Sequence, residues 1–299
     1  MRYEPALDLD SIRAIDVHVH IEHDDHGHAA LPHEVIDAAN AYFKRSADTP
    51  GIDAIAEAYR ARSMAAVVFT VDATTAMGVS PNSSIEIAES AARHNDVLIP
   101  FGSVDPLQGD AAKDMVKRLV EDHGVLGFKF HPSVQGFDPS DGQYEPLFEL
   151  IADYGLPTIF HTGQTGIGAG MPGGFGIRLA LSNPLLLDEL ACRVRHLKII
   201  MAHPSVPWQD EAISIATHKA NTWIDLSGWS PKYFPANLVQ AARTYLQDKV
   251  LFGTDFPAIT PERWLQDWER LDFPATVREK IEKTNAIKML GLEEKAVNG

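Results

Sequence analysis

Eight short runs rich in β-branched and other apolar residues recur along this chain of 299 residues. They span residues 14–20, 65–72, 97–105, 125–132, 157–163, 198–204, 222–228 and 250–257. Between them, segments such as 82–95, 109–124 and 146–155 repeat apolar residues every three to four positions, which indicates helices with one buried face. Strands that alternate eight times with helices predict an α/β fold, a (β/α)8 or TIM barrel, with residues 1–299 forming a single domain.

Polar residues gather where these runs end. Histidine lies at the end of the first, fourth, fifth and sixth runs. All strands of a barrel point the same way, so these ends meet at one rim, where barrel enzymes carry their catalytic residues. Strands also become polar simply because they leave the core, but that explanation accounts poorly for four histidines. We therefore predict an active site at this rim.

The first run, AIDVHVH, places His18 and His20 two residues apart. Residues at this spacing project from the same side of a strand, about 6.5 Å apart, and can chelate one metal ion. His161 in FHTG and Asp255 in GTDFP would add a third imidazole and a carboxylate. Such a set suits an open Zn²⁺ site. The alternatives are a hydrogen-bonded core histidine for His161 and a capping residue for Asp255.

Four motifs together resemble the amidohydrolase superfamily, in particular its amidohydrolase-2 branch. They are DVHVH, the histidine that ends the fifth run, AHP at the end of the sixth, and GTDFP in the eighth. The branch includes aminocarboxymuconate-semialdehyde decarboxylase and γ-resorcylate decarboxylase. The resemblance implies one divalent metal, Zn²⁺ or alternatively Mn²⁺, with four ligands: His18, His20, His161 and Asp255. It also implies catalytic roles for His203, in AHP, and for Asp255 as the acceptor of a proton from water.

The fourth run, GFKFHP, carries Lys129 and His131 on one side of the strand. Superfamily members with two metals use a carboxylated lysine at this place, whereas the amidohydrolase-2 branch generally holds one metal. We therefore expect Lys129 and His131 to contact substrate rather than metal.

Loops after the fifth, sixth and seventh runs supply further candidate substrate contacts. HTGQTGIGAGMPGGFGIR contains seven glycines, which allow the backbone to approach an anion closely, and it ends at Arg178, a candidate clamp for carboxylate or phosphate. It lacks the strand, GxGxxG and helix order of a dinucleotide-binding fold. The next two loops add four residues that could bind an aromatic ring or a charge: Trp208, Trp229, Lys232 and Tyr233. A surface loop and helix-packing tryptophans are the structural alternatives.

The segments FHTGQTGIGAG, AHPSVPWQDEA and DLSGWSPKYFP resemble a bacterial subgroup of 4-hydroxyphenyl-β-ketoacyl-CoA hydrolases. This resemblance implies a metal-dependent hydrolase that uses activated water to attack a carbonyl, with C–C cleavage of an aryl β-ketoacyl-CoA thioester. The alternative is a non-oxidative decarboxylase of an aromatic or unsaturated carboxylate, which would use the same metal. A non-catalytic barrel would have little need for all these ligand types at four strand ends.

The opening stretch continues as EHDDHGHAALPHE, where strand alternation is lost. It begins a connection of roughly 30 residues, longer than an ordinary strand-to-helix connection. We predict a lid-like loop here, with His23, His26 and His28 as solvated loop residues. Cys192, the single cysteine, lies in an amphipathic helical pattern, and we expect it to be buried.

Composition narrows the class of partner. The formal net charge is −15 and there is no concentrated basic stripe, which argues against nucleic acid. No run of about 18 apolar residues could span a membrane. The acidic, broken N-terminus does not look like a signal peptide, and one cysteine fits a reducing compartment. We expect a cytoplasmic enzyme for a small-molecule substrate, with homo-oligomer formation left open.

Overall fold

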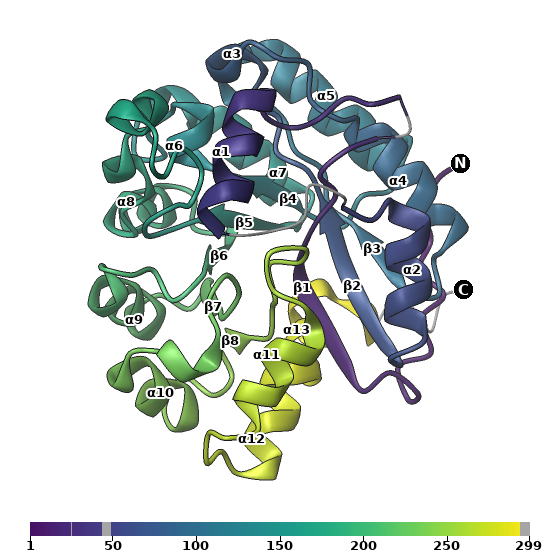
Figure 1. The fold of residues 1–299 in the computed structure, drawn as a ribbon, viewed down its shortest axis with the longest axis vertical. Helices are drawn as coiled ribbons and strands as arrows, with labels where there is room; N and C mark the ends of the chain where they lie inside the picture. The colour runs from purple at the N-terminus through teal and green to yellow at the C-terminus, as the bar shows by residue number, and fades with distance from the viewer. Residues whose placement is uncertain (25, 44–48, 294–299) are drawn as a thin grey trace.

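The computed structural model describes residues 1–24, 26–43 and 49–293, and Figure 1 shows its strands and helices. The strands are β1 (Ala14–His20), β2 (Met64–Phe69), β3 (Leu98–Pro100), β4 (Phe128–Phe130), β5 (Pro157–His161), β6 (Lys198–Ala202), β7 (Thr222–Asp225) and β8 (Val250–Leu251). They pair in parallel, in the order β1-β2-β3 and β4-β5-β6-β7-β8. Each of the eight predicted runs therefore contains a strand.

Backbone hydrogen bonds join the two sheets at both edges. Between β3 and β4, the Gly102 amide donates to the Gly127 carbonyl at 2.9 Å. Between β8 and β1, the Val17 amide donates to the Phe252 carbonyl at 3.0 Å. The strands thus follow one another around a (β/α)8 barrel, and the predicted fold class is confirmed.

All the observed strands except β1 end earlier than the predicted runs. β8 is the clearest case, because only Val250 and Leu251 pair regularly within the predicted run 250–257. The residues after them turn toward the barrel mouth and bond to β1 individually, as the Asp255 amide does to the His18 carbonyl at 2.9 Å. In β8 the polar end of the run therefore belongs to the site rather than to the sheet.

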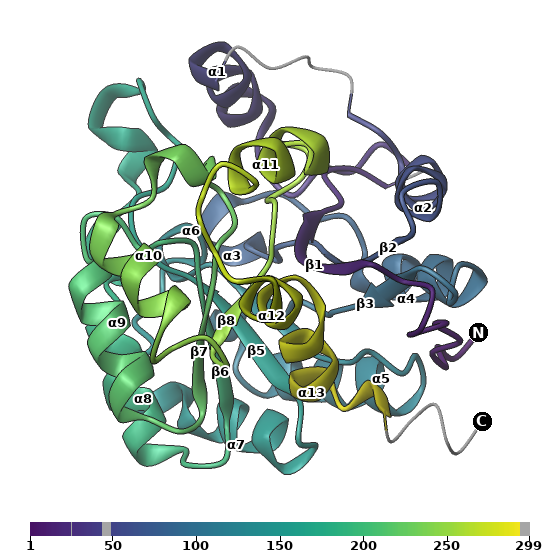
Figure 2. The same cartoon turned by 90° about the horizontal axis from the view of Figure 1, so that it is seen from below.

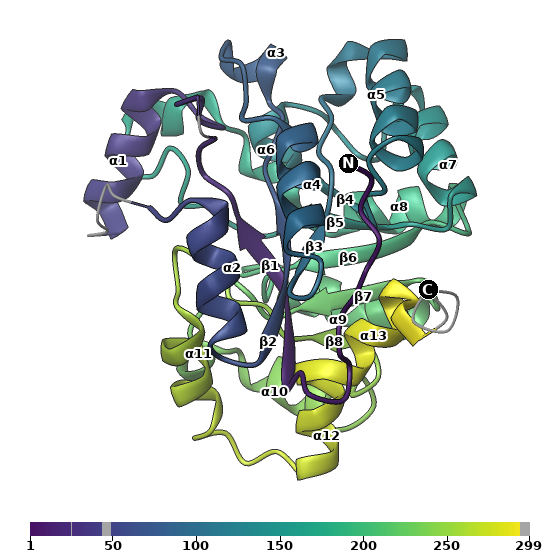
Figure 3. The same cartoon turned by 90° about the vertical axis from the view of Figure 1, so that its right-hand side faces the viewer.

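Helices cover the outside of the strands. They are α1 (His33–Phe43), α2 (Ile52–Arg60), α3 (Thr74–Met77), α4 (Ser84–Arg93), α5 (Asp110–Glu121), α6 (Pro132–Gln135), α7 (Glu145–Asp153), α8 (Leu185–Arg193), α9 (Gln209–His218), α10 (Ala236–Arg243), α11 (Pro261–Trp268), α12 (Ala275–Glu279) and α13 (Asn285–Leu290). Figures 1 and 3 show α2 and α4 beside β2 and β3, with α8, α9 and α10 beside β6 to β8. The three helices expected from sequence spacing correspond to α4, α5 and α7. Among the described residues, no helix is long and apolar enough to cross a membrane.

The long connection after β1 is partly helical, whereas the sequence analysis predicts only a loop. It contains α1, which Figure 2 shows outside the ring of strands. Val35 on this helix is fully buried, so tertiary contact stabilises α1. The polar residues around α1 kept the sequence pattern from predicting it. His26 and His28 lie exposed before it, as predicted, while His23 is half-buried with Nε2 2.9 Å from the Thr49 carbonyl. Residues 25 and 44–48 of this connection lie outside the described part of the chain.

Cys192 is exposed on α8, so the prediction that it is buried is wrong. The buried stripe of this helix consists of Leu187, Leu190 and Ala191, and Cys192 lies one position beyond it. Its Sγ lies 3.2 Å from Lys219 Nζ at the surface. Residue type favoured burial, but the position of the helix on the barrel decided the outcome.

Phenylalanines fill the layer between α7 and the neighbouring strands. The Phe148 ring of α7 lies 5.2 Å from Phe130 of β4 and 5.4 Å from Phe160 of β5, centroid to centroid. All three side chains are fully buried. Edge-to-face and tilted contacts at these distances add to the free energy gained by burying the rings.

We predict that Phe148→Ala lowers the free energy of unfolding by about 3–5 kcal/mol, because it leaves a cavity among rings that cannot fully collapse. Chemical denaturation followed by circular dichroism measures the change. Phe148→Leu is the matched control and should lose less, since it keeps most of the side-chain volume. Equal stability of Phe148→Ala and the wild type would contradict this account of the core.

Candidate metal centre

Three side chains converge at the barrel mouth. His18 Nε2 lies 3.2 Å from His20 Nε2, and Asp255 Oδ1 lies 3.2 Å from each of them. The two histidines come from β1, and the bond from the Asp255 amide to the His18 carbonyl holds the third residue against that strand. The His18 side chain is fully buried, whereas those of His20 and Asp255 are 26% and 22% exposed. The cluster is therefore reached from solvent past His20 and Asp255.

This cluster fits a divalent metal ion. Within the described residues, two groups of three histidine and carboxylate side chains have ligand atoms that all lie within 4.8 Å of one another. One is His18, His20 and Asp255, and the other is His18, His203 and Asp225. Imidazole nitrogen together with carboxylate oxygen is a ligand set used for Zn²⁺ and tolerated by Mn²⁺.

Asp225, at the end of β7, orients His18. Its Oδ2 lies 2.7 Å from His18 Nδ1, and both side chains are fully buried. Burial by itself would raise the pKa of Asp225, but the contact with His18 outweighs it and lowers that pKa to about 2. An ionised Asp225 can only accept, so it accepts a hydrogen bond from Nδ1–H of His18 and leaves the Nε2 lone pair facing the cluster.

The sequence analysis did not identify Asp225 or Ser227, although both stand in the polar end of the seventh run, TWIDLSG. Ser227 Oγ lies 2.9 Å from His203 Nδ1, and both residues lie at the mouth end of their strands. Gly228 follows, with φ +74°, and a Cβ at this position would lie 2.4 Å from His203 Nδ1. The end of β7 is thus shaped around two imidazole rings. The available signal was the same strand-end polarity that pointed to the predicted residues.

His161 and His203 form a second pair beside the cluster. His203 Nε2 lies 2.9 Å from His161 Nδ1, and the His203 ring centroid lies 4.9 Å from that of His18. His161 Nε2 is buried and has no hydrogen-bond partner in the described part of the structure. A buried polar atom without a partner is uncommon, and this one leaves a nitrogen of His161 available to a ligand. The structure thus brings three of the four expected ligands together, with His161 one ring away, and its role as a ligand stays a prediction.

Burial keeps His131, His161 and His203 uncharged at neutral pH. It lowers the pKa of His203 to about 4, and it lowers the pKa values of His131 and His161 well below the usual histidine range. The neutral form, with a lone pair on one nitrogen, is the form that binds a metal. These rings are therefore ready for ligation at neutral pH without first losing a proton.

Lys129 and His131 reach the mouth from β4, as strand alternation predicts. Lys129 Nζ lies 3.0 Å from His18 Nε2, fully buried, and burial lowers the pKa of Lys129 to about 8. The His131 ring stacks on that of His161 with centroids 3.8 Å apart. Both residues touch histidines of the site directly. Their assignment to substrate stays a prediction.

The five remaining candidates lie in the loops that follow β5, β6 and β7. Arg178, Lys232 and Tyr233 are exposed, while Trp208 and Trp229 are half-buried. Lys232 Nζ lies 4.7 Å from the centre of the Tyr233 ring. Across the described ranges, none of the five donates or accepts a hydrogen bond to the histidine cluster, so the structure does not bring them into it.

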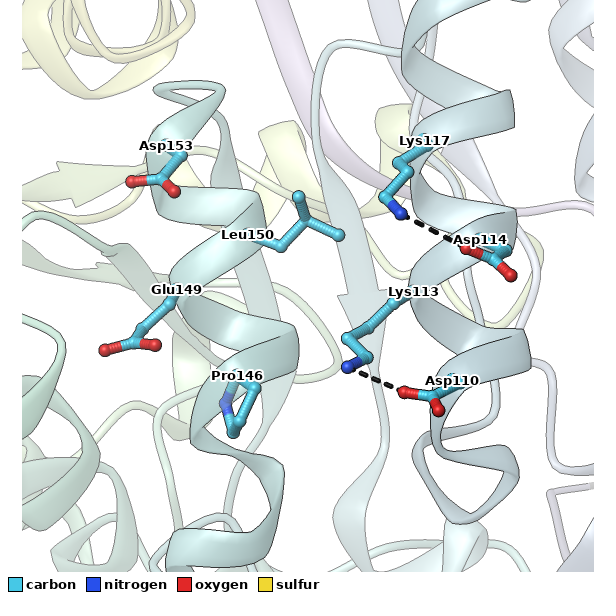
Figure 4. A pocket seen from close by; sticks show the side chains of 8 residues that line it. All are labelled: Asp110, Lys113, Asp114, Lys117, Pro146, Glu149, Leu150 and Asp153. Atoms are coloured by element: carbon cyan, nitrogen blue, oxygen red, sulfur yellow. Dashed lines mark hydrogen bonds and ion pairs between the residues drawn. The ribbon is translucent and has the colours of Figure 1, made fainter.

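A separate groove lies on the outside of the barrel, between α5 and α7 (Figure 4). Its lysines are neutralised within α5, because Lys113 pairs with Asp110 at 2.7 Å and Lys117 with Asp114 at 3.2 Å. None of the residues that line it is a predicted site residue. The chemistry of the molecule is therefore concentrated at the mouth, away from this groove.

Comparison with known proteins identifies the family of this chain. A family profile described as amidohydrolase matches residues 15–292. Among curated proteins, none matches the sequence of this chain.

The fold is shared with many solved structures, including the following three. An uncharacterised TIM-barrel protein from Bordetella bronchiseptica is 20% identical, with a TM-score of 0.75 over 95% of this chain and 99% of that chain. A dihydroxybenzoic acid decarboxylase from Polaromonas, with bound manganese and 2-nitroresorcinol, is 18% identical, with a TM-score of 0.65 over 95% and 99%. A protein from Acinetobacter baumannii assigned as a 2-pyrone-4,6-dicarboxylic acid hydrolase, with bound citric acid, is 12% identical, with a TM-score of 0.59 over 94% and 100%.

We predict that Asp225→Asn weakens the binding of Zn²⁺ by about 10–100-fold, the usual effect of losing a carboxylate that orients a ligand histidine. The neutral amide no longer enforces the tautomer that leaves the His18 Nε2 lone pair free. Competition with a chromophoric chelator on metal-depleted protein measures the affinity. Asp188→Asn, which removes a surface carboxylate 2.9 Å from Lys219, is the control and should bind like the wild type. Wild-type affinity in Asp225→Asn would show that this carboxylate does not support the metal site.

Proposed function

This chain belongs to the amidohydrolase family, and from that premise we propose that it is a metal-dependent hydrolase that adds water to an activated carbonyl carbon. The observation that carries the proposal is the position of Asp255. Its carboxylate is shared between His18 and His20 and remains partly exposed, so it can face a metal and a water molecule together.

Four side chains would hold the metal under this proposal: His18, His20, Asp255 and, through its unpartnered Nε2, His161. When bound, a divalent metal lowers the pKa of water to about 7 and polarises a carbonyl oxygen. We propose Zn²⁺, with Mn²⁺ as the alternative. The manganese in the dihydroxybenzoic acid decarboxylase of the same fold is consistent with that alternative.

Asp255 is the proposed proton acceptor. Burial acts to raise its pKa, but the neighbouring imidazoles of His18, His20 and His203 hold the pKa of Asp255 well below its usual range. The carboxylate is therefore ionised at neutral pH, which is the protonation state that a proton acceptor requires. His203, held at Nδ1 by Ser227, is proposed to stabilise the oxygen that gains negative charge or to relay a proton. Lys129 is a buried cation next to His18 and can hold that same oxygen.

We propose an aryl β-ketoacyl-CoA thioester as the substrate. Water adds to the aryl ketone carbon, the bond between this carbon and the α-carbon breaks, and the departing thioester enolate takes a proton to become acetyl-CoA. The other product is an aromatic acid. Exposed Arg178 and Lys232 would contact the anionic carrier, while Trp208, Trp229 and Tyr233 would contact rings.

A second candidate is a non-oxidative decarboxylase of an aromatic or unsaturated carboxylate. The fold is shared with a dihydroxybenzoic acid decarboxylase, and the buried Lys129 ammonium offers a contact for a substrate carboxylate. The same metal ligands would serve either reaction. The two candidates differ in the bond that breaks and in the fate of water.

We predict that turnover of an aryl β-ketoacyl-CoA in H₂¹⁸O places ¹⁸O in the carboxylate of the aromatic acid, without release of CO₂. Water supplies that oxygen only if it adds to the ketone carbon. Mass spectrometry of the acid and a coupled CO₂ assay measure the two outcomes. Stoichiometric CO₂ from a hydroxybenzoate, with no thioester accepted, would overturn hydrolysis in favour of decarboxylation.

We predict that His203→Asn lowers kcat by about 10²-fold or more, the usual scale for loss of an acid–base group, while metal content stays near that of the wild type. His203 touches His161 and Ser227 but is surplus to a four-ligand shell. Steady-state kinetics and metal analysis of the purified variant provide the two measurements. Loss of the metal would instead identify His203 as a ligand, and unchanged turnover would leave it a purely structural role.

A further inference from the structure

Asp16 is a buried carboxylate on β1, two residues before His18, and it has no cationic partner among the described residues. Its side chain is fully buried. Oδ1 accepts from the His18 amide at 3.1 Å and from the Thr254 amide at 3.0 Å. Oδ2 accepts from the Tyr59 hydroxyl at 2.6 Å and from the Thr254 hydroxyl at 2.5 Å. Four donors thus surround one carboxylate, and two of them belong to Thr254.

Thr254 stands directly before Asp255. Its Oγ1 donates to Asp16 and also accepts from the Phe256 amide at 3.1 Å. The residues on both sides of Asp255 are therefore tied to one hydroxyl. Asp255 itself has φ +67°, a left-handed conformation that is uncommon for residues other than glycine and is held only where the surroundings enforce it.

Backbone pairing holds Asp255 only at isolated points, through the bond from its amide to the His18 carbonyl and a single bridge between Phe256 and Val19. β8 pairs with β7 only through Val250 and Leu251, and the register between β1 and β2 shifts between Asp16 and Val19. Beyond these residues the edge between β8 and β1 is held by single backbone bonds. The Asp16 carboxylate supplies bonds across this edge where a continuous ladder is missing.

We propose that Asp16 and Thr254 form a clamp that positions Asp255 for metal binding and for proton acceptance. The proposal rests on the proposed function, because it takes Asp255 as both ligand and proton acceptor. The clamp works through the chain: the carboxylate fixes Thr254, and Thr254 fixes the backbone of Asp255. Neither residue contacts substrate or metal in this scheme, so both are positioning residues.

If Asp16 had a purely structural role, an apolar side chain could fill it at a lower free-energy cost of burial. Removing a carboxylate from water carries a desolvation penalty that hydrogen bonds must offset. Burial raises the pKa of Asp16 to about 6, against the effect of its hydrogen bonds. Asp16 lies between β1 and the segment after β8, which carry the proposed ligands, and it bonds to both. We infer that its role is to enforce the geometry of these ligands.

The test uses Thr254→Val, which keeps the shape of the side chain and removes both bonds of the hydroxyl. We expect the dissociation constant for Zn²⁺ to rise about tenfold or more, the scale for residues that orient ligands, and kcat to fall with little change in KM. Thr254→Ser restores the hydroxyl and should recover wild-type affinity. If Thr254→Val does not fold, Asp16→Asn replaces it in the test. Asp16→Asn should show the same loss of Zn²⁺ affinity and kcat.

The matched control is Thr158→Val on β5. Thr158 is also fully buried, and its hydroxyl donates to the Lys198 carbonyl at 3.0 Å at the opposite end of the strand from His161. This variant should lose stability in chemical denaturation while it binds Zn²⁺ like the wild type. It separates loss of a buried hydroxyl from loss of the clamp.

Two measurements on folded, metal-depleted protein decide the outcome: Zn²⁺ affinity by chelator competition, and the visible absorption spectrum after loading with Co²⁺. A weakened affinity and an altered Co²⁺ spectrum in Thr254→Val, rescued by serine and absent in Thr158→Val, support the clamp. Wild-type affinity and spectrum in folded Thr254→Val overturn it while leaving the proposed function standing. Failure of the wild type to bind either metal overturns the metal-dependent function, and the clamp with it.

Discussion

The contact between the end of β8 and β1 is the constraint on which the site depends. The chain must travel around the whole barrel before Asp255 meets His18, and a backbone bond of 2.9 Å from the Asp255 amide to the His18 carbonyl fixes them in register. The two histidines of β1 face the mouth only because residues two apart project to one side of a strand. Closing the barrel therefore creates the carboxylate–imidazole cluster, and no single segment contains it.

A buried layer of polar side chains supports this cluster from below. Asp225 fixes the tautomer of His18, Ser227 contacts His203, and Asp16 joins β1 to Thr254. Each of these groups is costly to bury, and each is compensated by hydrogen bonds to the end of another strand. The free energy gained by burying the apolar core thus offsets the cost of burying polar groups that orient the imidazole nitrogens. That arrangement is suited to a metal whose ligands must be placed before it arrives.

Under the proposed function, a different part of the molecule would set the choice of substrate. The proposed metal ligands lie at strand ends, whereas the proposed substrate contacts Arg178, Trp229 and Lys232 lie in the loops that follow β5 and β7. Loops on this rim can change without disturbing the strands beneath them. A hydrolase and a decarboxylase of one family can therefore share the same inner residues and differ in the outer ones.

Local periodicity determined what the sequence alone could predict. The eight strands, three helices, the common side of His18 and His20, and the rim at which Asp255 lies all follow from patterns within a few residues. Cys192 and α1 were mispredicted because burial depends on which face of a helix meets the barrel. Asp225 lies 207 positions from His18 in the chain, so only the order of strands around the barrel could pair them. Strand and helix periods are short-range properties of the backbone, whereas the partners of a buried carboxylate are decided by tertiary structure.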